Sequence, residues 1–211
     1  MIPIGIIQDK RHRPMVRKRG ARPSARKRIF DTAAELFYRN GIRAVGVEAI
    51  AAQADTTKMS LYRNFPSKDE LVAEWLRDHD ARFWEGWDSM AQKYPGDARK
   101  QLQAAFALLA KHVSDPLARG CPMANAAVEI TDKAHPARKV IETHKGALRA
   151  RLAALCEKTG AGEPSVLADQ LFLLMEGAQV SIILGVRGPA RNVGRAADAL
   201  IDAHLRGKPA A

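Results

Sequence analysis

A polar stretch within residues 57–68 carries side chains that can bond to nucleic acid. Hydroxyl, amide and ammonium donors stand close together there, with one thioether among them: Thr57, Lys58, Met59, Ser60, Tyr62, Asn64 and Lys68. Lys58 can donate to a base edge or to an adjacent phosphate. The side chains of Thr57, Ser60 and Asn64 can donate to either acceptor. This set therefore favours recognition of a DNA surface by hydrogen bonds and charge.

Three other side chains of this stretch suit narrower roles. Met59 can touch a thymine methyl group, and Tyr62 can bond a phosphate through its hydroxyl. Lys68 stands where a helix is predicted to start, which makes it a second candidate for a phosphate contact. The alternative is that these residues are solvated polar side chains on a short helix.

Two short helical patterns position these residues. The first has apolar side chains at the i, i+3, i+4 and i+7 spacing of one helix face, namely Val47, Ile50, Ala51 and Ala54. The second has Leu61 and Phe65, which are spaced for the same small core. Helices of this length are not stable alone, so the pair must pack against a third helix.

A sharp turn is predicted between the two patterns. Aspartate enters the left-handed region at low cost, so Asp55 can reverse the chain. The hydroxyl of Thr56 or Thr57 can then cap the second helix. A second helix with a polar outer face is narrow enough to enter a DNA major groove, so the pair is interpreted as a helix-turn-helix.

The third helix is predicted over residues 24–40. Ser24 can cap its start, and Gly41 can end it in a left-handed conformation. Its buried stripe consists of Ile29, Ala33, Leu36 and Phe37. We expect Phe37 to meet Ile50, Leu61 and Phe65 at the centre of a three-helix core.

The motifs along residues 28–71 occur in a specific combination of spacings. They are Ala33-Ala34-Glu35-Leu36-Phe37, Gly41, Ile50-Ala51, Leu61-Tyr62 and Phe65-Pro66-Ser67-Lys68. This stretch resembles the DNA-binding domain of the tetracycline-repressor (TetR) family. Two residues depart from the family pattern: Asp55 stands where glycine is usual, and Gly46 stands where a threonine or serine often caps the helix and touches phosphate.

The resemblance implies a function as well as a fold. It implies a homodimer whose two recognition helices meet successive major grooves, roughly 34–36 Å apart, on a near-palindromic operator. It also implies a repressor that a small apolar ligand releases from DNA, although activation is physically allowed. Lys58, Tyr62 and Lys68 are the DNA contacts that it supports best. A second segment, residues 118–125, resembles one subgroup of the family's ligand domains.

The charge of the chain is concentrated near its start. The 211 residues carry a formal net charge of +11, of which residues 1–30 contribute +9 and the remainder +2. We expect residues 1–23 to form a basic flexible arm that suits a polyanion; the alternative is a solubilising tail. A further hypothesis is that Met15, rather than Met1, is the natural start.

Other sequence signals restrict the class of protein. Cys121 and Cys156 stand apart, with no CxxC and no nearby histidine cluster, so no metal site, disulfide framework or cofactor is predicted, and the cytoplasm is expected. Cys121 as a redox sensor remains an alternative. No apolar run approaches the length of a membrane span, and the apolar residues 1–7 are too short for a signal peptide.

The rest of the chain is predicted to be helical throughout. Ser67 and Glu70 form a capping box that starts a long helix reaching toward Tyr94. The predicted fold is all-α: a helix-turn-helix domain over residues 24–70 and a helical effector-binding and dimerisation domain over residues 71–211.

The predicted helix that starts at Pro164 is apolar nearly all round, which requires burial on both sides. The last predicted helix offers small residues for close approach. Together they predict a dimer interface made of Leu167, Leu171, Leu174, Ala178, Ile182, Gly194, Ala197 and Leu200. The alternative is an entirely intramolecular core.

An apolar effector pocket is predicted between the bundle helices. Its walls and polar contacts would be Trp84, Trp87, Phe106, Met123, Asn125, Phe172, Met175, Glu176 and Gln179. The alternative is that these residues are plain core.

The alternatives to a regulator are an all-helical enzyme and a sequence-indifferent DNA-binding protein. An all-helical enzyme is disfavoured because the histidines and glutamates form neither HExxH nor a nucleophile elbow; His144, on an apolar stripe, is expected to be a satisfied core histidine. A sequence-indifferent basic DNA-binding protein that uses the arm remains the main alternative.

Overall fold

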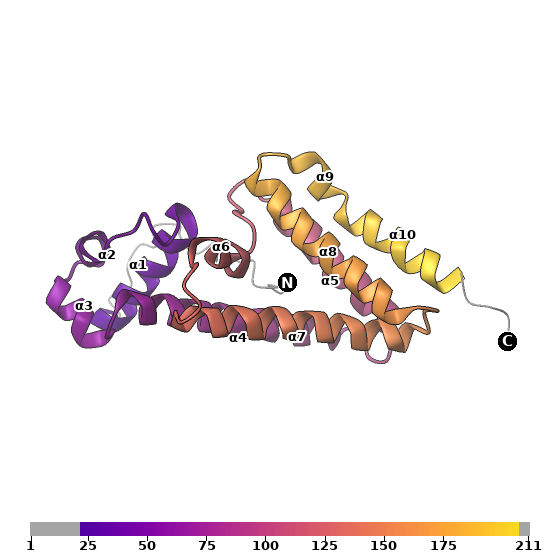
Figure 1. Ribbon diagram of the computed structural model, residues 1–211, viewed down its shortest axis with the longest axis horizontal. Helices are drawn as coiled ribbons and strands as arrows, with labels where there is room; N and C mark the ends of the chain where they lie inside the picture. The colour runs from indigo at the N-terminus through magenta and orange to yellow at the C-terminus, as the bar shows by residue number, and fades with distance from the viewer. Residues whose placement is uncertain (1–21, 207–211) are drawn as a thin grey trace. The chain divides into compact units, whose positions relative to one another are not determined.

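The computed structural model describes residues 22–206, and this part of the chain forms ten α-helices and no strand (Figure 1). The helices are α1 (Ala25–Asn40), α2 (Val47–Gln53), α3 (Lys58–Asn64), α4 (Lys68–Ala91), α5 (Ala98–Val113), α6 (Pro122–Glu129), α7 (Pro136–Thr159), α8 (Pro164–Ile183), α9 (Arg187–Arg191) and α10 (Val193–Arg206). The predicted all-α fold is confirmed. The basic arm falls almost entirely outside the described residues.

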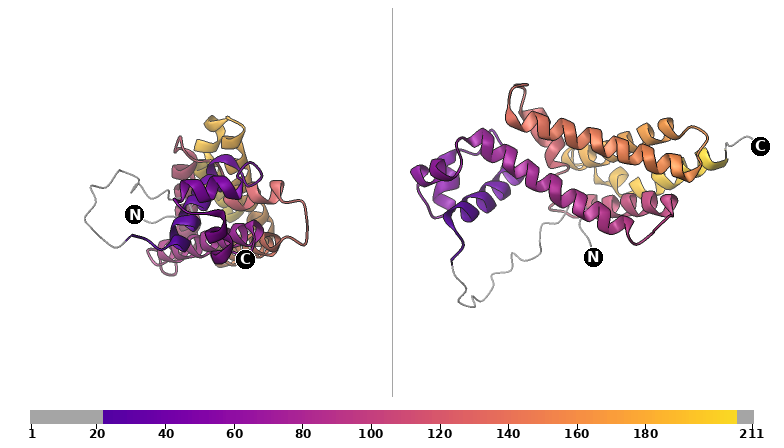
Figure 2. Two further views of the ribbon diagram at one scale, coloured as in Figure 1. Left: turned by 90° about the vertical axis from the view of Figure 1, so that its left-hand side faces the viewer. Right: turned by 90° about the horizontal axis from the view of Figure 1, so that it is seen from below.

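The described chain divides into two compact units. The N-terminal unit contains residues 22–79 and 122–141, and the C-terminal unit contains residues 80–121 and 142–206. The helix α4 runs unbroken from one into the other (Figure 2). The division therefore differs from the predicted boundary after residue 70, both in its place along α4 and in assigning α6 to the N-terminal unit.

The first three helices form the predicted small core. The hydroxyl of Ser24 accepts from the backbone N–H of Lys27 at 3.2 Å and so caps α1. Phe37, Ile50 and Leu61 are all buried, as is Phe65. The predicted helix-turn-helix core is confirmed. The physical reason is that each of the three helices has a single apolar face, and the three faces can be buried only against one another.

The turn between α2 and α3 depends on a strained residue and a clamp. Asp55 has a φ of 51° and is the one non-glycine residue with positive φ in the range 22–206. Arg28 holds the turn from α1: its guanidinium donates to the carbonyls of Ala54 and Asp55, each at 3.0 Å, and to that of Pro23 at 2.9 Å. Asp55 also forms an ion pair with Arg22. The turn is therefore positioned by side chains from outside the two helices that it joins.

Substitution of Asp55 tests the cost of this turn. Asp55→Val is expected to lower the free energy of unfolding by about 1–2 kcal/mol, because a β-branched side chain is disfavoured at positive φ. Asp55→Gly is expected to match or exceed the wild type in stability, since glycine adopts this conformation freely. Urea unfolding of the two variants measures both values. A valine variant as stable as the glycine variant would contradict the expectation.

Residues from α6 explain why residues 122–141 join the N-terminal unit. The carboxylate of Glu129 accepts from the backbone N–H of Arg43 at 2.8 Å. It also lies close to Gly41, where an added Cβ would come within 3.0 Å of Oε1. Gly41 is favoured by its φ of 85°, and a larger residue there would also displace the Glu129 carboxylate. This contact joins residues far apart in the chain, which the sequence pattern did not indicate.

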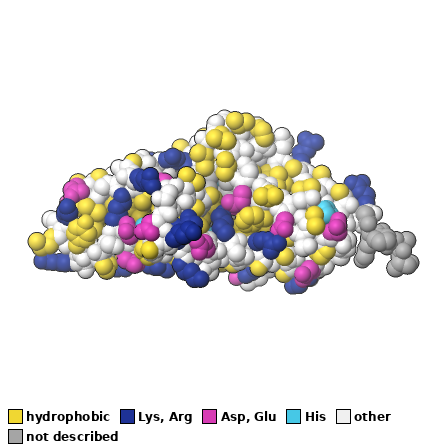
Figure 3. Space-filling view, in the orientation of Figure 1, with side chains coloured by type: hydrophobic (Ala, Val, Ile, Leu, Met, Phe, Trp, Pro, Cys, Tyr) yellow, Lys and Arg dark blue, Asp and Glu magenta, His cyan; other side chains and the backbone are white. Residues whose placement is uncertain are grey.

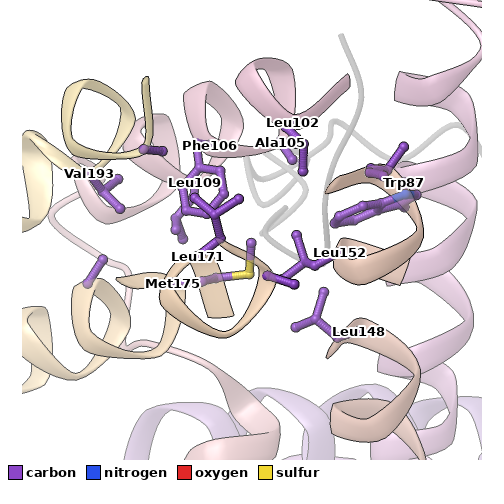
Figure 4. Packing of buried hydrophobic residues seen from close by; sticks show 14 of the residues in the cluster. Trp87, Leu102, Ala105, Phe106, Leu109, Leu148, Leu152, Leu171, Met175 and Val193 are labelled. Carbon is purple, nitrogen blue, oxygen red and sulfur yellow. The ribbon is translucent and has the colours of Figure 1, made fainter. Parts of the chain in front are cut away.

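The C-terminal unit is a bundle in which α5, α8 and α10 lie side by side (Figure 1). Its core gathers side chains from α4, α5, α7, α8 and α10, including Trp87, Phe106, Leu152, Leu171 and Met175 (Figure 4). Burial of these large apolar side chains is the main stabilising contribution to this unit.

By length and composition, α8 is apolar enough to cross a membrane. The core helix of a soluble protein passes the same test, and α8 packs against α5, α9 and α10. Its composition is therefore weak evidence of a membrane span. Within the described residues, one of the two apolar faces of α8 is buried against the core of its own unit.

Candidate nucleic-acid interface

The outer face of α3 carries both polar and apolar side chains. The hydroxyl of Thr57 accepts from the backbone N–H of Ser60 at 3.1 Å, which confirms the predicted cap. Met59 is 64% exposed and Tyr62 44% exposed, so both side chains face solvent. They line a shallow depression of about 680 Å³ together with Thr57, Lys58 and Arg63. In the space-filling view, hydrophobic side chains at this end border charged ones (left in Figure 3).

Lys58 is already ion-paired. Its Nζ donates to Glu48 Oε1 at 2.6 Å, and both side chains are exposed. The hydrogen bond raises the pKa of Lys58 and lowers the pKa of Glu48, so both groups are charged at neutral pH. Because α2 supplies Glu48 and α3 supplies Lys58, the pair bridges the two helices at the outer surface.

Two predicted contact residues also make internal bonds. The amide of Asn64 donates to the carbonyl of Ser60 at 2.8 Å. The ammonium of Lys68 donates to the carbonyl of Ile42 at 2.6 Å, and burial lowers its pKa. Each retains further donors, since an amide has two protons and an ammonium three. Their contacts with DNA remain predictions.

Two residues at this surface are not among the predicted DNA contacts, although the sequence places Arg63 on the outer face of the second helix. Arg63 lines the depression and donates to the sulfur of Met59 at 3.3 Å. Glu48 was missed because an acidic residue gives no sign of phosphate binding. The available signal was spacing: Arg63 stands four residues after Met59 on the same helix face.

The predicted dimer interface stays a prediction, and its residues differ in how far their own unit buries them. Leu167, Leu171, Ala178, Ile182 and Ala197 are buried in the core of their own C-terminal unit. Leu174 and Leu200 pack against that core, and Gly194 faces the backbone of α5. The first five are therefore buried within the subunit, whereas Leu174, Gly194 and Leu200 are only half-buried. The sequence showed two apolar faces on α8 but not which one the subunit itself covers.

The opposite face of α8 is the exposed apolar one. Leu173 is 68% exposed and Leu184, directly after the helix, is 71% exposed. Val166 and Val180 are also exposed, and a Cβ added at Gly177 would meet no neighbouring atom within 4 Å. These residues, at i, i+7, i+11, i+14 and i+18, form one stripe, here called the outer stripe. Hydrophobic side chains also gather on the ridge above the end of α8 (Figure 3).

The residues of the predicted effector pocket lie in both units. Met123 and Asn125 belong to α6 in the N-terminal unit, and the other seven lie in the C-terminal unit. Trp87, Phe106 and Met175 are buried in its core. Trp84 and Phe172 pack against that core. The pocket stays a prediction.

Glu176, one of the predicted polar contacts of the pocket, forms a largely buried ion pair. Lys145 donates to Glu176 at 2.5 Å and to the sulfur of Cys121 at 3.4 Å. Burial lowers the pKa of Lys145, but the charges of Cys121 and Glu176 outweigh this effect and raise it overall. Burial raises the pKa of the Cys156 thiol to about 11, so this thiol is protonated at neutral pH.

A second polar cluster lies in the same unit. Asp80 Oδ1 lies 2.7 Å from Nδ1 of His144 and accepts from the indole N–H of Trp84 at 2.8 Å. Burial lowers the pKa of His144, so the neutral ring donates to Asp80. His144 is therefore a satisfied core histidine, as predicted. Within residues 22–206, no group of histidine, cysteine and acidic side chains is arranged to hold a metal.

Two family sequence models match the chain. The model for bacterial regulatory proteins of the tetR family matches residues 29–75, which contain all of α2 and α3. The model for the C-terminal domain of tetracyclin repressor-like proteins matches residues 98–197. Together the two matches extend from residue 29 in α1 to residue 197 in α10.

Curated relatives share the region around the helix-turn-helix. The transcriptional repressor KstR of Rhodococcus jostii is 40% identical over 76 residues, which are 36% of this chain and 34% of that protein. The uncharacterised HTH-type transcriptional regulator YvkB of Bacillus subtilis is 33% identical over 76 residues, 36% of this chain and 38% of that protein. The matched segment thus spans roughly a third of these relatives.

Solved structures are similar over most of the chain. A TetR-family transcriptional regulator from Streptomyces coelicolor has a TM-score of 0.80 and 26% identity, covering 85% of this chain and 95% of that one. A candidate regulator of the same type from Streptomyces avermitilis has a TM-score of 0.75 and 31% identity, covering 87% of this chain and 99% of that one.

Proposed function

The chain belongs to the TetR family of bacterial regulatory proteins, and from this premise we propose that it is a homodimeric repressor that a small apolar ligand releases from a near-palindromic operator. Members of the family are DNA-binding transcriptional regulators and not enzymes. The observation that carries the proposal is the exposed face of α3, which the clamp on the Asp55 turn presents to solvent. We place its activity in the cytoplasm, where chromosomal DNA is accessible.

The outer stripe of α8 supports the dimer. Large apolar side chains in a continuous stripe are rare on the surface of a soluble monomer and mark an interaction surface. Gly177 lies within the stripe and lets a second helix approach closely. A two-fold contact between two copies of this stripe is self-complementary, since a contact of residue i with residue j of the partner is repeated as a contact of j with i. A dimer of this kind would present two copies of α3 to successive major grooves.

Release by ligand would be a population shift. The helix α4 extends from the N-terminal unit into the C-terminal unit, so a change at one end can move the other. The effect of the ligand on DNA affinity is limited by the difference between its affinities for the two conformations. The predicted pocket residues are mainly apolar and aromatic, which favours an apolar ligand. An occupied pocket would stabilise the conformation that does not fit the operator.

The proposal is tested by selecting operator fragments from the source genome and measuring binding by gel shift at two salt concentrations. Lys58→Ala and Tyr62→Phe are each expected to weaken operator binding by about tenfold, since each loses a charged or hydrogen-bonded contact. Deleting residues 1–21 is expected to weaken binding to operator and random duplex alike, because phosphate attraction does not depend on sequence.

The matched control is Lys100→Ala, which removes the same charge from α5 in the other unit. Its operator affinity should equal that of the wild type. A wild-type protein that binds random duplex as tightly as every selected fragment would establish the alternative, a sequence-indifferent basic DNA-binding protein. An unchanged Lys58→Ala variant would contradict the assignment of that residue.

A further inference from the structure

We infer that Glu48 and Lys58 act together as a single reading unit that recognises one G·C base pair in each half of the operator. This inference rests on the proposed function, because it concerns how the same surface chooses its DNA. The two residues come from different helices, yet their charged groups lie 2.6 Å apart at the surface.

A carboxylate on this surface carries a cost. Glu48 repels phosphates, and it holds Lys58 in a bond that DNA must replace. Non-specific DNA offers mainly phosphates, so it attracts Lys58 while repelling Glu48. The pair therefore weakens binding to DNA in general and adds specificity only where a base pair satisfies both groups.

A G·C pair satisfies both groups. In the major groove, guanine presents the acceptors N7 and O6, and cytosine presents the N4 amino donor beside them. The ammonium of Lys58 can donate to guanine while the carboxylate of Glu48 accepts from cytosine. The guanine O6 and cytosine N4 atoms are themselves hydrogen-bonded at about 2.9 Å, a spacing close to that of the two charged groups.

An A·T pair satisfies them less well. The acceptors adenine N7 and thymine O4 lie on either side of the adenine N6 donor, and the thymine methyl group lies beside O4. Lysine could then reach only one acceptor next to the donor that the carboxylate uses, instead of two adjacent acceptors, and on the thymine side the methyl group would desolvate a charged group without replacing its hydrogen bonds. The geometry therefore favours G·C over A·T at this position.

The neighbouring contacts hold the pair in place. Thr57 caps α3 one residue before Lys58, and Arg28 fixes the turn that joins the two helices. The backbone positions of both charged residues are thus set before DNA binds. Preorganisation of this kind reduces the ordering cost of recognition.

The experiment uses the full-length protein and a pool of randomised palindromic duplexes. Wild type, Glu48→Gln and the control Glu35→Gln are each taken through rounds of binding and sequencing. The control removes the same charge from an ion pair with Arg39 on α1. Dissociation constants are then measured for the selected duplex, for the same duplex with the G·C position changed to A·T, and for random duplex.

Wild type and Glu35→Gln are expected to select G·C at one symmetric position and to lose about tenfold or more in affinity when it becomes A·T. Glu48→Gln should keep the other preferred positions but lose the preference at this one. It should also bind random duplex several-fold more tightly, with a salt dependence steeper by about one phosphate contact.

Three results would overturn the inference. In the first, Glu48→Gln selects the same base as the wild type at every position. In the second, the wild type selects A·T at the position where Glu48→Gln shows no preference. Either outcome leaves the regulator proposal intact. A wild-type protein that selects no sequence at all overturns both proposals, so the failure of one is distinguishable from the failure of the other.

Discussion

Leu173→Glu is expected to separate the proposed dimer and to lower operator affinity by about a hundredfold or more. Leu173 lies in the middle of the outer stripe and is 68% exposed in the single subunit. A charge at this position costs little in a monomer, because the side chain stays in water. In a dimer the same charge would be buried against apolar side chains, where an unpaired carboxylate is strongly unfavourable. The substitution therefore acts on assembly and not on folding.

The loss of DNA affinity follows from geometry. Once one half of a dimer is bound, the second half binds as an intramolecular event at a high effective concentration. A monomer loses this advantage although its α3 is unchanged. Analytical ultracentrifugation measures the assembly, and gel shift with full and half operators measures the affinity. The ratio between full-operator and half-operator affinities should collapse in the variant.

Val128→Glu is the matched control for this experiment. Val128 lies on α6 in the N-terminal unit and is also highly exposed, so the same charge is added outside the outer stripe. The control should remain dimeric and bind the operator as tightly as the wild type. A Leu173→Glu variant that stays dimeric would show that the outer stripe is not the interface.

Glu176→Leu is expected to give the largest loss of stability, about 2–3 kcal/mol in the free energy of unfolding. The carboxylate of Glu176 is the main partner of Lys145, whose ammonium is largely buried. Removing the carboxylate leaves that charge without its counterion in a region of low polarity. We place the expected loss below that for a fully buried pair, because the two side chains retain 18% and 23% of their exposure.

The double variant Lys145→Met with Glu176→Leu separates charge from packing. Replacing both partners with apolar side chains of similar length removes the unpaired charge, so most of the lost stability should return. Asp169→Leu serves as a control in the same helix, because its ion pair with Arg149 is exposed and expected to contribute little. Urea unfolding of each variant completes the cycle. A double variant less stable than Glu176→Leu would contradict this account.

The N-terminal core was predictable from local signals. The capping hydroxyls of Ser24 and Thr57, the turn at Asp55 and the spacing of buried residues are properties of short segments. Each of the three short helices has only one apolar face that can be buried, so the spacing of its apolar residues specifies how it packs. The predicted DNA-contact residues of α3 followed from the same reasoning, since they occupy the face of the helix that is not buried.

The exposed apolar face of α8 was not predictable in this way. Apolar residues surround α8, so periodicity could not distinguish the face that packs against α5 and α10 from the face that remains exposed. The structure places Leu171 inside and Leu173 outside, two residues apart on the same helix. Which face of α8 is buried depends on which helices pack against it, and that information is spread over residues far apart in the chain.

By itself, the sequence determined the helix-turn-helix, its cap and its turn, because those depend on interactions within short segments. Only the tertiary structure decided that Glu48 meets Lys58, that Glu129 bonds to the backbone beside Gly41, and that the outer stripe faces solvent. The physical reason is the same in each case. Contacts between residues on different helices depend on how those helices pack, and no spacing along a single helix encodes them.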